Sequence, residues 1–114
     1  RLNLIKTGLQ NVQKDPLGDG VGVAGPASIH NPSAEITENH YIQLARELGV
    51  LGLGLFSLLS LTVLLGLDYK NKWSLVALAS WSGLSLANMF LHTWADPTVA
   101  ITWWSFAGLL QKQK

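Results

Sequence analysis

Two long runs of apolar residues dominate the second half of the chain. Residues 48–67 read LGVLGLGLFSLLSLTVLLGL without one ionisable side chain, and Trp73 to Leu91 form a second run without charge. At roughly 1.5 Å of rise per residue, about twenty helical residues reach about 30 Å, the hydrocarbon thickness of a bilayer. A soluble chain of this size has no core wide enough to bury two such helices. The pattern therefore predicts membrane-spanning helices over 48–67 and 73–94.

A third apolar stretch covers residues 98–111. A helix of this length reaches only about 20 Å, so it is either a shortened third span or an interfacial helix. The basic tail that follows favours a crossing. Trp94, Trp103 and Trp104 fit an aromatic belt at the membrane boundary.

The polar first half alternates between helical and irregular patterns. Residues 1–14 predict an amphipathic helix that Pro16 ends, lying against the membrane, against the rest of the protein or on an ordinary surface. Helical periodicity returns at Glu35, with Thr37 or Ser33 as N-cap, and continues into the first apolar run. The apolar stripe of the first helix consists of Leu2, Ile5, Leu9 and Val12. The second helix is expected to expose Glu38, Asn39, Gln43, Arg46 and Glu47.

Composition agrees with a membrane protein, since 48% of the residues are hydrophobic and 13% are charged. A net charge of +1 argues against a nucleic-acid surface, and the absence of cysteine excludes disulfides and thiolate metal sites. The chain begins with Arg1 and shows no signal peptide, so we expect a piece of a longer protein. The predicted fold class is an all-α integral membrane helical bundle, with a loop region over 1–47 and transmembrane helices over 48–114.

The placement of charge predicts an orientation. Lys70 and Lys72 lie in the short turn 68–72 and further lysines end the chain, whereas five of the seven acidic residues precede Leu48. The positive-inside rule places this turn and the C-terminus in the cytoplasm. Residues 1–47 would then lie on the outer side.

A glycine-rich loop separates the two predicted helices of the first half. Gly20, Gly22 and Gly25 spell G-x-G-x-x-G, which indicates dinucleotide binding only after a strand and within a βαβ unit. The sequence predicts neither. We expect instead a loop whose exposed backbone amides approach a phosphate or a sugar.

Polar residues just before the first apolar run are candidates for chemistry. The carboxylate of Glu38 or the imidazole of His40, on either side of Asn39, would remove a proton from a sugar hydroxyl. Arg46 would hold a diphosphate through charge-assisted hydrogen bonds. Alternatively, the acids favour the helix dipole, and Arg46 pairs with Glu38, with Glu47 or with a lipid phosphate.

A second candidate pair lies at the end of the second apolar run. His92 and Asp96 are four residues apart and could form a carboxylate-oriented imidazole or half of a metal site. Two ligands are too few to predict a metal, and the two side chains could satisfy each other. No nucleophile elbow, zinc motif or Walker loop occurs.

Two stretches resemble the O-antigen ligase and polymerase-like membrane proteins. DPLGDGVG at 15–22, which follows Arg1 and an amphipathic helix, is similar to the family's "P-L-x-G-x-G" entry to its large periplasmic loop. ENHYIQ at 38–43 and ELGVLG at 47–52 resemble the signature "H-N-x-Y-L-Q, several residues, E-x-G-x-x-G" that leads into a late transmembrane helix.

This resemblance implies the C-terminal portion of a polytopic fold similar to the C-type glycosyltransferases. Its partners would be membrane lipids, the remaining transmembrane helices and an undecaprenyl-diphosphate-linked glycan donor, with no cofactor and no metal. Arg1 aligns with an arginine thought to hold the diphosphate, and Glu38 aligns with the histidine proposed as catalytic base. Asn39, His40, Gln43 and Arg46 are the further candidates for substrate binding.

Glu38 is a departure from the family pattern, because it stands where the histidine is expected. His40 would point about 200° away from it on a helix and cannot simply replace it. The alternative function is a non-catalytic membrane scaffold or a lipid-binding subunit. A transporter would require ionisable groups near the bilayer centre, and neither long apolar run contains one.

Overall fold

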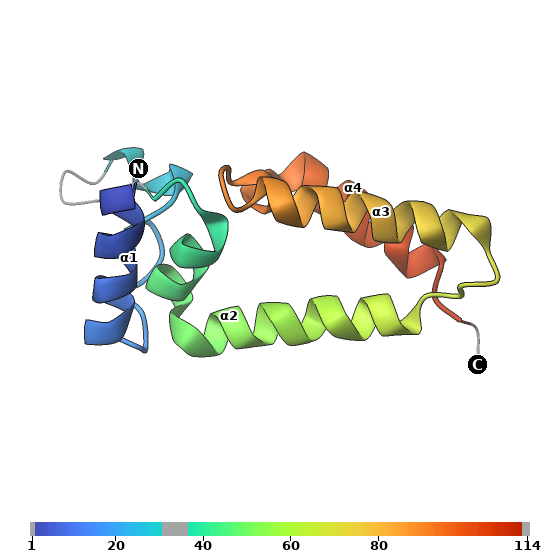
Figure 1. The fold of residues 1–114 in the computed structure, drawn as a ribbon, viewed down its shortest axis with the longest axis horizontal. Helices are drawn as coiled ribbons and strands as arrows, with labels where there is room; N and C mark the ends of the chain where they lie inside the picture. Colours follow the sequence, from blue (N-terminus) through green and yellow to red (C-terminus); the bar gives the residue numbers. More distant parts are fainter. Residues whose placement is uncertain (1, 31–36, 113–114) are drawn as a thin grey trace.

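The computed structural model describes residues 2–30 and 37–112, and this part of the chain is all-α (Figure 1). The fold class is therefore confirmed as helical. An isolated bridge between Leu67 and Gln111 is the one extended pairing in these residues. The helices are α1 (Leu2–Lys14), α2 (His40–Gly66), α3 (Lys72–Ala87) and α4 (Pro97–Leu109), with short 3₁₀ helices η1 (Pro26–His30) and η2 (Thr93–Ala95).

The helix predicted over residues 1–14 is observed as α1, and it lies beside the first turns of α2 (Figure 1). The two helices approach closely at Gly8, where an added Cβ would lie 2.6 Å from Cγ2 of Ile42. A glycine here removes the side chain that would hold the helices apart. The partner of α1 within this chain is therefore α2.

Helix α2 begins at His40, five residues later than the predicted start at Glu35. Asn39 is the N-cap, since its Oδ1 accepts the amides of Tyr41 at 3.0 Å and Ile42 at 3.1 Å. The prediction of Thr37 as cap is wrong, and Ser33 lies outside the described residues. At Gly49 the backbone is non-helical, with φ of 73°, and α2 changes direction there (Figure 1).

Among the residues that the structure describes, α2 is the one helix long and apolar enough to cross a membrane. Only 11% of its most apolar 18-residue window is buried within the chain. A core helix of a soluble protein would bury most of that surface.

Helix α3 is shorter than the predicted span 73–94, which is wrong in its last part. The helix ends at Ala87, and the side chain of Asn88 is the cause. Its Nδ2 donates to the carbonyl of Leu84 at 2.7 Å, and its Oδ1 accepts the amide of Trp94 at 3.1 Å. The chain therefore turns into η2. The predicted stretch 98–111 is observed as α4, which runs beside α3.

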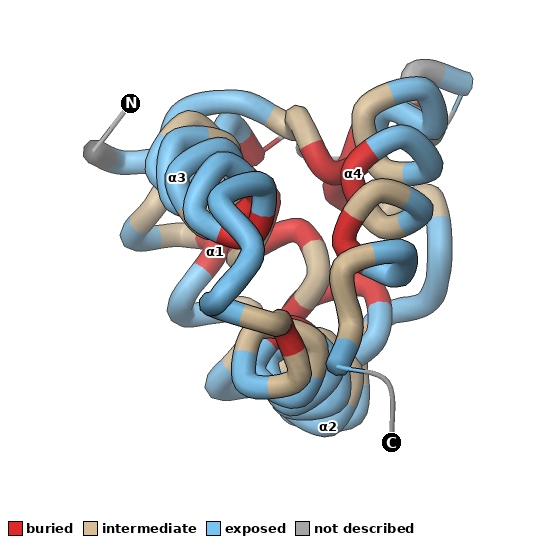
Figure 2. The backbone as a smooth tube through the Cα atoms, turned by 90° about the vertical axis from the view of Figure 1, so that its right-hand side faces the viewer, coloured by how far each residue is buried: buried red, intermediate tan, exposed pale blue. Residues whose placement is uncertain are grey.

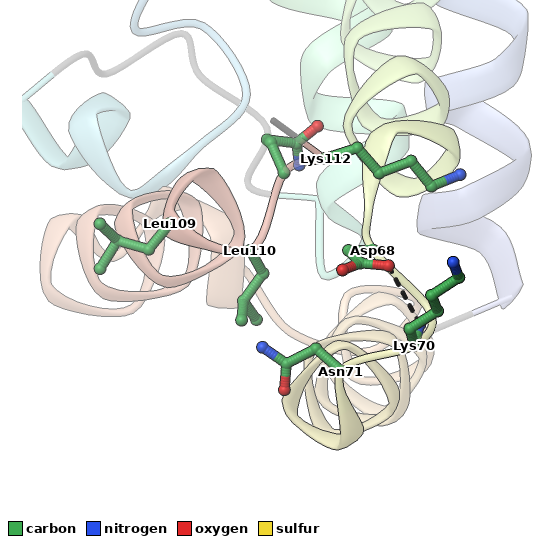
Figure 3. A pocket seen from close by; sticks show the side chains of 7 residues that line it. Asp68, Lys70, Asn71, Leu109, Leu110 and Lys112 are labelled. Atoms are coloured by element: carbon green, nitrogen blue, oxygen red, sulfur yellow. Dashed lines mark hydrogen bonds between the residues drawn. The ribbon is translucent and has the colours of Figure 1, made fainter. Parts of the chain in front are cut away.

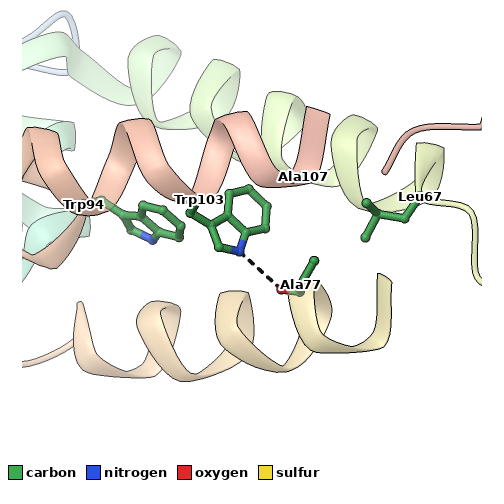
Figure 4. Close-up of a cluster of buried hydrophobic side chains, with 5 residues drawn as sticks. All are labelled: Leu67, Ala77, Trp94, Trp103 and Ala107. Carbon is green, nitrogen blue, oxygen red and sulfur yellow. Dashed lines mark hydrogen bonds between the residues drawn. The ribbon is translucent and has the colours of Figure 1, made fainter. Parts of the chain in front are cut away.

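The straight part of α2, α3 and α4 form a three-helix bundle, which Figure 2 shows end-on with buried residues between the helices. Alanines 77 and 107 are fully buried, which lets the helices approach closely. The rings of Trp94 and Trp103 meet edge to face at 5.4 Å, and Trp103 Nε1 donates to the carbonyl of Ala77 at 3.2 Å (Figure 4). Trp94 and Trp103 are buried, so the predicted aromatic belt is wrong for both.

The outer surface of the bundle is apolar and its two ends differ. Exposed side chains on α2 to α4 include Leu51, Leu55, Leu58, Leu65, Leu75, Leu86 and Ile101.

At one end of the bundle, the backbone amide of Asp68 donates to the carbonyl of Leu110 at 2.9 Å, and that of Lys112 donates to the carbonyl of Gly66 at 2.9 Å. These bonds bring the lysine-bearing turn 68–72 and Lys112 together, whereas α1 lies at the opposite end (Figure 1).

Candidate functional site

The glycine-rich loop folds over the first turns of α2 and donates its amides to Glu47. The backbone N–H groups of Gly22, Ala24 and Gly25 lie 3.1, 3.4 and 3.2 Å from Glu47 Oε1. Hydrogen bonds to a carboxylate are stronger than those between neutral groups. The expectation that these amides are exposed for a phosphate or a sugar is wrong for these three, because Glu47 occupies the position that an anion would take.

The same loop satisfies the backbone groups that the bend at Gly49 leaves unpaired. A helix end exposes carbonyls and a helix start exposes amides. The amide of Asp19 donates to the carbonyl of Arg46 at 2.7 Å, and that of Gly20 donates to the carbonyl of Glu47 at 3.2 Å. The amide of Val50 donates to the carbonyl of Pro16 at 2.9 Å. Loop and bend are therefore one hydrogen-bonded unit.

Two glycines make this contact possible. A Cβ on Gly49 would lie 2.5 Å from the carbonyl oxygen of Leu17, and a Cβ on Gly18 would lie 2.5 Å from the amide nitrogen of Gly49. Both glycines have positive φ, which side chains disfavour. The two stretches that carry the family resemblance thus meet backbone to backbone.

A line of buried polar side chains follows one face of α2 from the N-cap to the bend. His40 Nδ1 lies 3.3 Å from Gln43 Oε1, and Gln43 Nε2 donates to Glu47 Oε2 at 3.1 Å. Spacings of three and four residues place these groups on the same side of a helix. All three side chains are less than a tenth exposed, so the prediction that Gln43 and Glu47 are surface residues is wrong.

His40 joins this line to the α3–α4 connection. Its backbone amide donates to the carbonyl of Asn88 at 3.0 Å, and its ring lies edge to face with that of His92 at 6.4 Å. Burial lowers the pKa of His40 below its ordinary value, and the neighbouring His92 adds to this lowering. The bond to Gln43 and the charge of Glu47 oppose the lowering of this pKa.

The remaining predicted site residues differ in accessibility. Glu38 is exposed and precedes the N-cap, so it is not on a helix and the expected 200° relation to His40 does not apply. The guanidinium of Arg46 forms an ion pair with Asp19 at 3.6 Å and is 8% exposed. Arg1 lies outside the described residues. Asn39 caps α2 with its side-chain oxygen, and its Nδ2 donates to the carbonyl of Met89 at 3.3 Å.

The two side chains of the second predicted pair, His92 and Asp96, contact different partners instead of each other. Asp96 is the N-cap of α4, and its Oδ1 accepts the amide of Thr98 at 2.8 Å. His92 instead faces His40. Within residues 2–30 and 37–112, no three side chains of the metal-binding types gather closely enough to hold an ion.

Glu47 is the central residue for which the sequence pattern predicted no catalytic or binding role, although it begins the stretch ELGVLG of the family resemblance. The available signal was its position four residues after Gln43 and two before Gly49, with a glycine-rich loop earlier in the chain to supply amides. Comparisons with models of known families, with curated proteins and with solved structures give no match for this chain.

Proposed function

We propose that this chain is part of a membrane-embedded glycan ligase or polymerase, which transfers a glycan from an undecaprenyl-diphosphate-linked donor to an acceptor hydroxyl in surface polysaccharide synthesis. One observation carries the proposal. The two stretches of the resemblance, 15–22 and 38–52, are far apart in the sequence and fold into one unit at the end of the long apolar helix.

The apolar surface of the bundle supports a location in the membrane. Large exposed apolar patches are rare on soluble monomers, and here they continue around α2, α3 and α4. The longest dimension of the molecule is 48 Å, against a hydrocarbon thickness of about 30 Å. We therefore place the three helices of the bundle in the lipid and the α1 region beyond it.

The lysines support one orientation of this multi-pass arrangement in the plasma membrane. The turn 68–72 and Lys112 lie at the same end of the bundle, which suits the cytoplasmic side under the positive-inside rule. Residues 1–47 then lie outside, where a lipid-linked glycan is transferred.

In this proposal Glu38 acts as the base that takes the proton of the acceptor hydroxyl as that oxygen attacks the anomeric carbon with inversion. The bond from the anomeric carbon to the diphosphate oxygen breaks in the same step, and undecaprenyl diphosphate leaves. Its support is its exposure beside the polar end of α2. Arg1 holds the donor diphosphate. Arg46, which is buried against Asp19, holds the loop in place instead of contacting the donor directly.

A non-catalytic scaffold or lipid-binding subunit is the second candidate. It is favoured by the internal bonding of Asn39, His40 and Gln43, whose polar groups contact other parts of the chain. Such groups stabilise a fold without needing a substrate.

A transfer assay on the whole protein separates the two candidates. Vesicles would receive an undecaprenyl-diphosphate oligosaccharide and its acceptor, and glycan transfer would be followed by gel shift. We expect Glu38→Gln and Arg1→Ala to lose activity by about a hundredfold or more with normal membrane insertion. Glu35→Gln, which changes an acid outside the resemblance, is the control. Glycan transfer at the wild-type rate by both variants would refute the assignment of this chain to an enzyme.

A further inference from the structure

An open pocket lies at the lysine-bearing end of the bundle, opposite the candidate site. Its volume is about 540 Å³ and it lies between the α2–α3 turn and the chain leaving α4 (Figure 3). We propose that this pocket binds the headgroup of an anionic phospholipid. The lining residues are Asp68, Lys70, Asn71, Leu109, Leu110, Gln111 and Lys112.

The charge of the pocket suits a phosphodiester. Lys70 and Lys112 are both exposed and extend to the same side of it (Figure 3). The acid in the lining, Asp68, accepts the backbone amide of Lys70 at 3.1 Å, so one of its oxygens is already occupied. Lys72 lies close by in the chain and places its ammonium 5.8 Å from the ring of Trp73. Two lysines and one carboxylate therefore line the pocket, and a third lysine follows close by in the chain.

The apolar rim favours a lipid over a free phosphate. Leu109 is 86% exposed and lies across the pocket from the lysine ammonium groups (Figure 3), and Trp73 and Tyr69 expose about half of their surfaces at the same end of the bundle. Aromatic residues at such positions mark the level of the lipid headgroups. A lipid would place its phosphate between the lysines and its acyl chain along Leu109, whereas a soluble phosphate would leave that leucine uncovered. Basic residues beside the bilayer attract anionic lipids.

Native mass spectrometry of the whole protein tests this site. The protein would be released from nanodiscs that contain phosphatidylglycerol and phosphatidylcholine, and the lipids retained would be counted. We expect preferential retention of phosphatidylglycerol, and a loss of about tenfold in that preference for the double variant Lys70→Gln/Lys112→Gln. Lys6→Gln/Lys14→Gln removes the same charge from α1 at the other end and should retain the wild-type preference.

Two further arms identify the source of the phosphate. The variant Leu109→Asn keeps the lysines and should lower the retention of phosphatidylglycerol. Soluble glycerol 3-phosphate should compete poorly with phosphatidylglycerol for the pocket. The proposed site would be overturned if the two double lysine variants retained phosphatidylglycerol equally. It would also be overturned if the wild-type protein showed no preference for phosphatidylglycerol. Glycerol 3-phosphate binding as tightly as the lipid would overturn its assignment to a lipid. None of these measurements depends on glycan transfer.

Discussion

Gly18 and Gly49 lie against each other where the glycine-rich loop crosses the bend of α2, each with positive φ. Neither position has room for a Cβ atom. The bend is therefore formed jointly by the helix and by the loop that covers it.

Replacing Gly49 by alanine should destabilise the fold. The new Cβ would meet the carbonyls of Pro16 and Leu17, and positive φ alone costs an alanine about 1 to 2 kcal/mol. Denaturant unfolding in detergent micelles would measure the loss. Gly54→Ala is the matched control, because no atom apart from the neighbouring backbone of its own helix lies within 4 Å of its Cβ position. Equal stability of the two variants would contradict the close crossing.

Glu47→Gln should release the loop while keeping the shape of the side chain. The amide can still offer one oxygen to the loop, but it loses the charge and brings its NH₂ group towards Nε2 of Gln43. Bonds to charged groups contribute about 1.5 to 3 kcal/mol. We expect hydrogen exchange of the Gly22 and Gly25 amides to accelerate at least about tenfold.

A second carboxylate provides the control for this exchange experiment. Asp96→Asn removes the charge from a residue that caps α4, so its effect should stay near Thr98. Unchanged exchange of the loop amides in Glu47→Gln would show that another contact holds the loop.

Trp103→Phe should weaken the contact between α3 and α4. The indole N–H donates to the carbonyl of Ala77 and to Ser80 Oγ, both at 3.2 Å, and phenylalanine has no donor. The expected loss is about 0.5 to 1.5 kcal/mol for the hydrogen bond, in addition to the lost packing. Thermal unfolding followed by circular dichroism would compare it with Trp104→Phe. A larger loss for Trp104→Phe would contradict this assignment.

The contact between α2 and the α3–α4 connection should weaken in acid. His40 precedes the bend, outside the predicted span 48–67, and its pKa is lowered by burial, with Gln43, His92 and Glu47 facing it. As the pH falls below the ordinary histidine value of about 6.5, the unfolded chain binds a proton that the folded chain resists. Stability is therefore full above that value and declines as the pH falls towards the folded pKa.

Thermal unfolding midpoints at about pH 7.5 and about pH 5.5 would measure this decline, because the two pH values lie on either side of the ordinary histidine pKa. His40→Asn should reduce the difference between the two pH values, whereas His30→Asn, at an exposed position, should preserve it. The same pH dependence in His40→Asn and wild type would assign the effect to another group.

Local patterns predicted the helical elements well. The stripe of residues 1–14 and the apolar run from 48 onwards became α1 and the straight part of α2 because periodicity and composition act within a few turns. The early end of α3 was not predictable in this way. It depends on Asn88, whose side chain bonds both its own helix and Trp94 in the next element.

The candidate site was predicted less completely, because its partners come from distant parts of the chain. Gln43 and Glu47 have polar side chains, which favours the surface. The loop amides donate to Glu47 from more than twenty residues away, and Glu47 in turn accepts a hydrogen bond from Gln43. Trp103 is buried for a comparable reason, since the small side chains of Ala77 and Ala107 leave room for it. Neither relation is visible in a single helical pattern.

The pairing of α2 with its neighbours is closed at both ends by main-chain bonds. His40 donates to Asn88 at one end, and Asp68 and Lys112 bond to Leu110 and Gly66 at the other. Splaying the helices apart would break these main-chain bonds at both ends of the bundle together. The bundle should therefore move as a rigid body.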